Sequence, residues 1–164
     1  MKKLYIIRHG KSSWDFPHLK DIDRPLKKRG IKDAHLMGKL FKNKHIQPEL
    51  IVSSPAVRAH EAAKIIAGEI GYPETKIAEN DRLYFSGVSG ILDVVKRTAD
   101  DVNSLFIFGH NPDFTSLANC FSENYIDNVP TCGTVCVNFE IESWKEVTSS
   151  NGSVEFFEFP SKHR

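Results

Sequence analysis

The sequence predicts an α/β fold, a three-layer α/β/α sandwich with a mostly parallel sheet, formed by a single domain over residues 1–164. Short apolar runs recur along the chain, and stretches with apolar residues at helical spacing separate them. No internal repeat or low-complexity segment interrupts this alternation. A chain of 164 residues is long enough to bury a core without disulfides or a structural metal.

The first half of the chain predicts two strands and two helices. Residues 3–8 form a buried apolar run, and residues 25–43 carry apolar side chains at helical spacing. A polar loop, residues 11–24, separates the two. The second strand is expected at 50–53. Ser54 and Pro55 then suit the N-cap and the first helical position of a helix that ends near Gly71.

The second half predicts one more helix-and-strand unit and a terminal strand pair. A helix over about 89–97 precedes a strand at 104–109, and Asn111-Pro112 repeats the cap-and-proline device to begin a helix through Phe121. Apolar residues alternate over 135–141, and a further apolar run covers 154–159. We expect these two runs to pair as antiparallel strands.

Composition excludes several classes of protein. The 22 Lys and Arg residues nearly balance the 21 Asp and Glu residues, so nucleic acid is not an expected partner. No stretch is apolar enough to span a bilayer, and Arg8 ends the first apolar run too early for a signal peptide. Three cysteines without a CxxC pair indicate neither a disulfide framework nor a zinc site. We therefore expect a cytoplasmic protein without membrane contact.

Three of the apolar runs end at residues that can hold a phosphoryl group. The first run ends at Arg8-His9-Gly10, the second at Ser53-Ser54-Pro55 followed by Arg58, and the third at Gly109-His110-Asn111-Pro112. The carboxyl ends of parallel strands meet at one edge of a sheet, where open α/β sheets bind their ligands. We therefore expect Arg8, His9, Arg58 and His110 to meet in one pocket.

These residue types suit phosphoryl transfer. A planar guanidinium donates two parallel hydrogen bonds to an oxyanion, and catalysis of phosphoryl transfer depends mainly on positioning and charge neutralisation. A neutral imidazole, with an ordinary pKa of about 6.5, is a competent nucleophile toward phosphorus. The pattern predicts a site that phosphate or sulfate would occupy and that needs no metal and no cofactor.

The same residues carry a family resemblance. Arg8-His9-Gly10, with Ser12 and Trp14 after it, resembles the signature of the histidine phosphatase superfamily, which has the phosphoglycerate mutase-like fold. The segments around Arg58 and His110 resemble that family's second and third motifs, so the likeness covers residues 4 to about 118. Within the family, Asp23-Arg24-Pro25-Leu26, Arg29-Gly30 and Leu83-Tyr84 are similar to the SixA branch of phosphohistidine phosphatases.

The resemblance implies a role for each matching residue. It makes His9 the nucleophile that is phosphorylated, and Arg8, Arg58 and His110 the residues that bind its phosphoryl group. Ser12 and Asn111 stand at motif positions that can contact phosphate. Asp15 stands where the larger mutases carry asparagine, and its carboxylate would repel a phosphate unless it is protonated or turned away.

The family's usual proton donor, a glutamate, has no clear counterpart in this chain. Asp81 is the nearest match, although it also fits an ordinary loop carboxylate. An alkoxide leaving group has a conjugate-acid pKa of about 15.7 and needs a donor, whereas a departing imidazole has one of about 6.5. A phosphohistidine substrate thus demands less acid catalysis.

The sequence therefore predicts a metal-independent phosphatase that works through a phosphohistidine intermediate. Its expected partner is a phosphohistidine-bearing protein, such as a phosphotransfer domain of a signalling relay. A phosphatase of small phosphomonoesters, a mutase and a non-catalytic phospho-ligand binding module remain alternatives. Asp21-Ile22-Asp23 hints at a phosphoaspartyl or cation site but follows no predicted strand. Trp14, Tyr84 and Phe85 are expected either to line the mouth of the site or to pack in the fold, and packing is favoured for Trp14.

Overall fold

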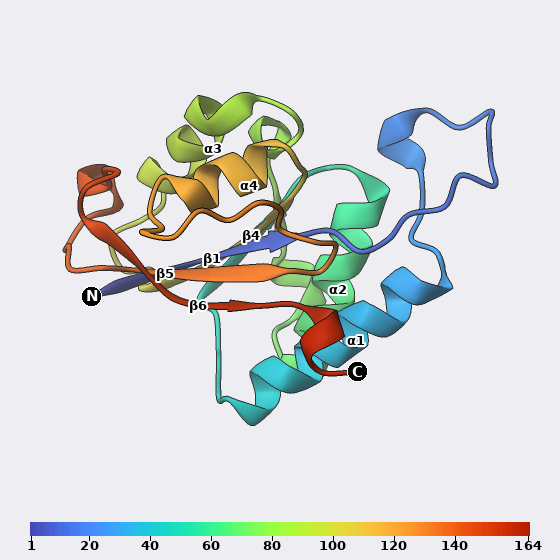
Figure 1. Ribbon diagram of the computed structural model, residues 1–164, viewed down its shortest axis with the longest axis horizontal. Coiled ribbons are helices and arrows are strands. Elements are labelled where there is room, and N and C mark those ends of the chain that lie inside the picture. The colour runs from blue at the N-terminus through green and yellow to red at the C-terminus, as the bar shows by residue number, and fades with distance from the viewer.

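A six-stranded sheet lies between two layers of helices in the computed structural model, which describes residues 1–164 (Figure 1). The strands stand in the order β3-β2-β4-β1-β5-β6. Their bounds are β1 Lys2–Arg8, β2 Leu50–Ser53, β3 Ala78–Glu79, β4 Ser104–Gly109, β5 Thr134–Phe139 and β6 Gly152–Glu158. The helices are α1 Lys28–Asn43, α2 Val57–Ile70, α3 Gly87–Lys96 and α4 Asp113–Asn119. None of these helices is long and apolar enough to cross a membrane.

The four strands β1 to β4 are parallel and the last two are antiparallel. β4 pairs in parallel with both β1 and β2, while β5 pairs antiparallel with β1 and β6 antiparallel with β5. Both the mostly parallel sheet and the terminal antiparallel pair are thus confirmed. β3 was not predicted because two paired residues are too few to leave an alternating pattern.

Alternate side chains of the central strands pack into two separate hydrophobic cores, one on each face of the sheet. Leu4, Ile6 and Ile107 pack on the side covered by α3 and α4, and the cluster there includes Ile91 and Phe114. On the opposite face, β-strand side chains pack against α1 and α2 in a cluster that includes Tyr5, Ile7, Phe106, Phe41 and Ile66. Side chains of a strand point alternately to its two faces, so a strand covered on both sides is apolar along its length.

The arrangement of the helices opens a crevice at the carboxyl ends of β1 and β4. These strands are neighbours, with Arg8 opposite Gly109 at their ends. The chain leaves β1 toward α1 on one face and leaves β4 toward α4 on the other, so the two connections diverge (Figure 1). Such a divergence between neighbouring parallel strands is where α/β sheets hold their ligands.

Two helices begin later than the sequence predicts. α1 begins at Lys28 because Pro25 and Leu26 belong to an extended segment that pairs with residues 12–13. Ser12 bridges Leu26, and the Ser13 amide donates to the Pro25 carbonyl at 2.9 Å. α2 begins at Val57 with Ala56 at its N-cap, so the prediction that Ser54 caps this helix is wrong.

The start and end of α4 also differ from the prediction. Pro112 occupies the N-cap position, and the helix ends at Asn119 instead of Phe121. The Asn111 side chain still performs a cap, from one residue earlier, because its Oδ1 accepts the Thr115 amide at 3.1 Å. The prediction that the Asn111 side chain caps this helix is therefore correct, but Asn111 stands one residue before the N-cap position.

Gly30 lets α1 approach the loop that leaves β1. A Cβ atom on Gly30 would lie 2.3 Å from the Lys11 carbonyl oxygen, a backbone atom that cannot move alone. We predict that Gly30→Ala lowers the free energy of unfolding by about 1–3 kcal/mol, the usual range for overpacking. Gly68→Ala is the matched control, because a Cβ there meets nothing within 4 Å. In urea denaturation it should stabilise the protein by about 0.5–1 kcal/mol. Equal effects of the two substitutions would contradict the close approach.

Candidate active site

The structure brings the four predicted side chains together at the carboxyl edge of the sheet. Arg8, His9 and Arg58 line one pocket of about 300 Å³. The His110 ring lies beside the His9 ring, with 5.1 Å between their centroids. Both histidines and Arg58 are buried. Three of the four predicted groups therefore line one pocket, and the fourth, His110, lies against the His9 ring.

His9 is held as a neutral imidazole with a defined tautomer. Its Nδ1 lies 2.5 Å from the Gly10 carbonyl oxygen, which only accepts, so Nδ1 carries the proton. Burial lowers the pKa of His9 to about 3, and the charges of Arg58 and Arg8 act in the same direction, while the hydrogen bond to Gly10 opposes them. At neutral pH the Nε2 lone pair is therefore available as a nucleophile.

His110 is fixed by one hydrogen bond and two aromatic rings. Its Nε2 lies 2.8 Å from Ser54 Oγ, while Phe85 stacks on the ring at 4.8 Å and Tyr84 meets it edge-on at 5.3 Å. Burial, and then the neighbouring His9, lower the pKa of His110 to about 3. Its Nδ1 is buried without a hydrogen-bond partner.

Arg58 is oriented by Asp21, a residue of the loop that follows β1. Arg58 Nη1 donates to the Asp21 carbonyl at 2.7 Å and Nη2 donates to its carboxylate at 3.0 Å. The Tyr84 hydroxyl donates to the same carboxylate at 2.7 Å. Burial favours a raised pKa for Asp21, but the bonds from Tyr84 and Arg58 outweigh it and hold the pKa below its ordinary value. Asp21 is thus an anion that holds the Nη end of Arg58, while Nε stays buried without a partner.

Arg8 is held by the loop before β5. Its Nη1 donates to the Val129 carbonyl at 3.1 Å, and its Nε is buried without a partner. Burial lowers the pKa of Arg8; the charge of Arg58 also lowers it, and Cys132 opposes both. Two arginines that repel each other across a pocket, each with an unpaired buried Nε, form a site complementary to an oxyanion.

Arg24 adds a third guanidinium to the pocket and is itself buried. It donates to Ser12 Oγ, and its guanidinium carbon lies 3.4 Å from the centroid of the Trp14 ring. Its Nη1 is 3.5 Å from Asp21 Oδ1. Trp14 is 76% exposed, so the favoured prediction that it packs against the fold is wrong. The ring lines the pocket and lies against Arg24, as the alternative had it.

The other predicted site residues take different positions. Ser12 lines the pocket, where its hydroxyl accepts from Arg24. Asp15 is exposed, its carboxylate makes no hydrogen bond, and it does not line the pocket. The Asn111 amide donates to Asn128 and Val129 and accepts from Thr115, which leaves none of its groups free in this arrangement. Phosphate contact by Asn111 and Asp15 stays a prediction.

Asp81, the predicted proton donor, begins a short 3-10 turn over Asp81–Leu83. It is exposed, and its carboxylate forms no hydrogen bond or ion pair with the four central residues. From the same segment, Tyr84 and Phe85 do reach the site, through their contacts with His110. The donor role of Asp81 also stays a prediction.

Sequence reasoning missed Asp21, Arg24 and Ser54 as parts of this site. Asp21 and Arg24 lie in the polar loop 11–24, whose path over the sheet edge is set by the pairing of Ser12 with Leu26. Ser54 was assigned to a helix cap, but its hydroxyl faces His110. The Asp-x-Asp-Arg-Pro-Leu run was the one signal that could have pointed to the first two.

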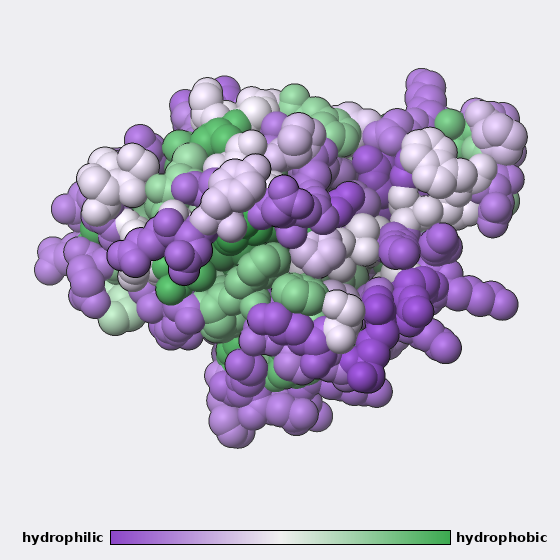
Figure 2. All heavy atoms as spheres, viewed as in Figure 1, coloured by the Kyte–Doolittle hydropathy of each residue, from purple (hydrophilic) through white to green (hydrophobic).

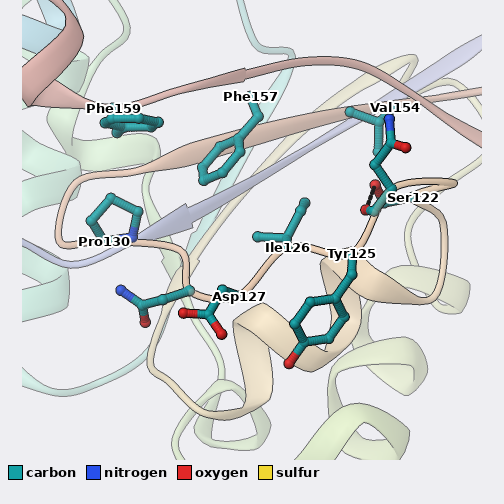
Figure 3. A pocket seen from close by; sticks show the side chains of 10 residues that line it. Ser122, Tyr125, Ile126, Asp127, Pro130, Val154, Phe157 and Phe159 are labelled. Carbon is teal, nitrogen blue, oxygen red and sulfur yellow. Dashed lines mark hydrogen bonds between the residues drawn. The ribbon is translucent and has the colours of Figure 1, made fainter.

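A second hollow, of about 520 Å³, lies beside the site and is mainly apolar (Figures 2 and 3). In Figure 3, Val154, Phe157 and Phe159 lie across from Tyr125 and Ile126 of the preceding loop. No histidine, arginine or lysine lines it. It therefore lacks the groups needed for phosphoryl chemistry.

The two buried histidines should stay neutral over a wide pH range. We predict that ¹⁵N spectra in phosphate-free buffer show neutral His9 and His110 rings down to about pH 5, since burial lowers both pKa values to about 3. A histidine peptide, with a pKa of about 6.5, is the control. Because the unfolded state binds these protons first, stability should fall as pH decreases from about 6.5 toward 3. An imidazolium signal from either ring near pH 6 would contradict the assignment.

Comparisons with known proteins agree with this geometry. Residues 4–84 match the family model "Histidine phosphatase superfamily (branch 1)". An uncharacterized chloroplastic protein of Arabidopsis thaliana is 29% identical over 92% of this chain and 72% of its own length. An uncharacterized protein of Mycobacterium tuberculosis is 31% identical over 68% of this chain and 67% of its own.

One solved structure is similar to this chain over nearly its whole length. The protein histidine phosphatase SixA complexed with tungstate superposes with a TM-score of 0.83 at 20% identity, covering 99% of both chains. The three strand-end motifs and the matched family model lead to one conclusion. This chain belongs to the histidine phosphatase superfamily.

Proposed function

We propose that this protein is a phosphatase that hydrolyses phosphohistidine groups on proteins through a covalent phosphohistidine intermediate on His9. The observation that carries the proposal is the neutral His9 ring, with Nδ1 bound to Gly10 and Nε2 unprotonated, beside Arg8 and Arg58 in one pocket. The name of the similar SixA structure, a protein histidine phosphatase, supports the same substrate class.

In the first step, His9 Nε2 attacks the phosphorus atom and the phosphorus–nitrogen bond of the substrate breaks. The substrate imidazole leaves as a neutral ring, because its other ring nitrogen takes a proton from solvent. Arg8 and Arg58 neutralise charge on the equatorial oxygens, and the buried Nδ1 of His110, when protonated, donates to one of them. No strong general acid is required for this leaving group.

In the second step, water attacks the phosphorus of phosphorylated His9. The ring then carries the phosphoryl group on Nε2 and a proton on Nδ1, so it is a cation whose proton is bound by the Gly10 carbonyl. Cleavage of the Nε2–phosphorus bond returns the electron pair to Nε2 and restores the neutral ring, and inorganic phosphate leaves. Gly10 thereby keeps His9 a good nucleophile and a good leaving group.

We further propose that a metal ion is not needed, because Arg8 and Arg58 supply the positive charge that a metal would bring. The partner in this proposal is a phosphohistidine-bearing protein such as a phosphotransfer domain. The phosphoryl group of phosphohistidine is acid-labile and needs little help from a proton donor. It therefore suits a site whose candidate proton donor, Asp81, makes no contact with the four central residues. A small phosphomonoester would need that donor for its alkoxide.

Removal of His9 should abolish turnover and leave the fold intact. We predict that His9→Ala lowers turnover of a phosphohistidine peptide at least 10³-fold with an unchanged circular dichroism spectrum. The parent should carry an acid-labile phosphoryl group on His9 during turnover. His45→Asn, at an exposed histidine with a positive φ angle, is the matched control. Turnover by His9→Ala, or a parent without the label, would contradict the proposal.

The same assay separates the alternatives when sugar phosphates are added to the panel. Higher kcat/KM for phosphomonoesters would favour a small-molecule phosphatase. Transfer of the phosphoryl group to a sugar acid instead of water would reveal a mutase. Binding without turnover of any substrate would leave a non-catalytic phospho-ligand binding module.

Asp21 acts as a positioning residue in this proposal, through Arg58. We predict that Asp21→Asn lowers kcat for phosphoramidate about tenfold, which corresponds to about 1.4 kcal/mol of transition-state stabilisation. Inorganic phosphate should bind at least as tightly as to the parent, because the pocket loses a negative charge. Asp23→Asn is the control, since that exposed carboxylate makes no contact with Arg58. Weaker phosphate binding with unchanged kcat would argue against positioning.

A further inference from the structure

The pocket that contains His9 has more positive charge than one phosphoryl group requires. Five of its lining side chains are cationic, and no carboxylate lines it. These cations are Arg8, Lys11, Arg24, Lys27 and Arg58. Asp21 neutralises one charge through its bonds to Arg58 and Arg24. A phosphoryl dianion neutralises two more, so two positive charges remain without a counter-ion.

Backbone pairing holds two of these cations side by side. The Lys27 amide donates to the Lys11 carbonyl at 3.0 Å, next to the antiparallel bridge between Ser12 and Leu26. Residues opposite each other in an antiparallel pair project to the same side, and like charges placed so repel each other. Both lysines line the pocket and neither forms an ion pair. An anion between them would remove this repulsion.

Arg24 supplies a third cation on the same side of the pocket. It is only 7% exposed, and its Nε is buried without a hydrogen-bond partner. Burial lowers the pKa of Arg24, the charge of Arg58 lowers it further, and Asp21 opposes both. The Trp14 ring lies over the guanidinium, with its centroid 3.4 Å from the guanidinium carbon. A planar, buried guanidinium whose Nε has no partner is suited to bind a carboxylate.

We propose that Lys11, Arg24 and Lys27 form a second anion subsite beside the phosphoryl site, and that it binds an acidic side chain of the substrate protein. This inference rests on the proposed function and narrows its substrate class to phosphohistidine flanked by Asp or Glu. The pocket volume of about 300 Å³ is roughly ten times the 30 Å³ that one water occupies in the liquid. It has room for a phosphoryl group and one small anionic group.

The first test compares two phosphohistidine peptides that differ only in carrying Glu or Gln next to the phosphohistidine. At low ionic strength the parent should prefer the Glu peptide about tenfold in kcat/KM. In the variant Lys11→Ala with Lys27→Ala, this preference should fall to about twofold or less. A control variant, Lys32→Ala with Lys39→Ala, removes the same net charge from exposed positions on α1 and should keep the preference. Equal kcat/KM for both peptides in the parent, or equal loss in both variants, would overturn the subsite.

A binding measurement makes failure of the subsite distinguishable from failure of the proposed function. By calorimetry, pyrophosphate should bind the parent at least tenfold more tightly than inorganic phosphate, and Lys11→Ala with Lys27→Ala should remove this difference. If that pattern holds while no phosphohistidine peptide is turned over, the subsite stands and the proposed function fails. If peptides are turned over without preference and pyrophosphate binds no more tightly, only the subsite fails.

Discussion

The contact between Asp21 and Arg58 is the constraint on which the rest of the site depends. Arg58 is buried in the first turn of α2, where a positive charge also opposes the helix dipole. Asp21 compensates with both its carbonyl and its carboxylate, and the Tyr84 hydroxyl donates to the same carboxylate oxygen as Arg58. One anion thereby links the loop after β1, the start of α2 and the segment after β3. Without Asp21, the guanidinium groups of Arg8, Arg24 and Arg58 would repel one another with no anion between them.

The neutral state of both histidines follows mainly from their burial, which disfavours the charged ring. The charges of Arg8 and Arg58 act in the same direction on both rings. The Gly10 carbonyl determines which nitrogen of His9 keeps the proton, so the tautomer is set by the backbone at the end of β1. In the proposed mechanism, positive charge for the phosphoryl group comes from the arginines, and nucleophilicity comes from an imidazole that burial keeps neutral, with the arginine charges acting in the same direction.

The part of the site that the sequence predicted is the part fixed by strand ends. His9, His110 and the helix carrying Arg58 follow β1, β4 and β2, and parallel pairing alone brings such ends together. Arg24 and Lys27 could not be placed in the same way. Their positions depend on the pairing of Ser12 with Leu26, a nonlocal contact without a periodic signal. Ser54 was misassigned because its residue type suits both a helix cap and a bond to His110.

The residues at the strand ends and the cations at the mouth of the pocket are held by different parts of the fold. The groups proposed to bind the phosphoryl dianion lie on the sheet edge and on α2, where both cores restrict movement. The cations at the mouth lie on a loop and on the segment before α1, held by two short backbone contacts and by Trp14. Changes of sequence in this loop can alter the charge around the phosphoryl group without disturbing the packed sheet. Under the two proposals, reaction chemistry and substrate preference would be carried by separate parts of the chain, and Asp21 contacts both through Arg58 and Arg24.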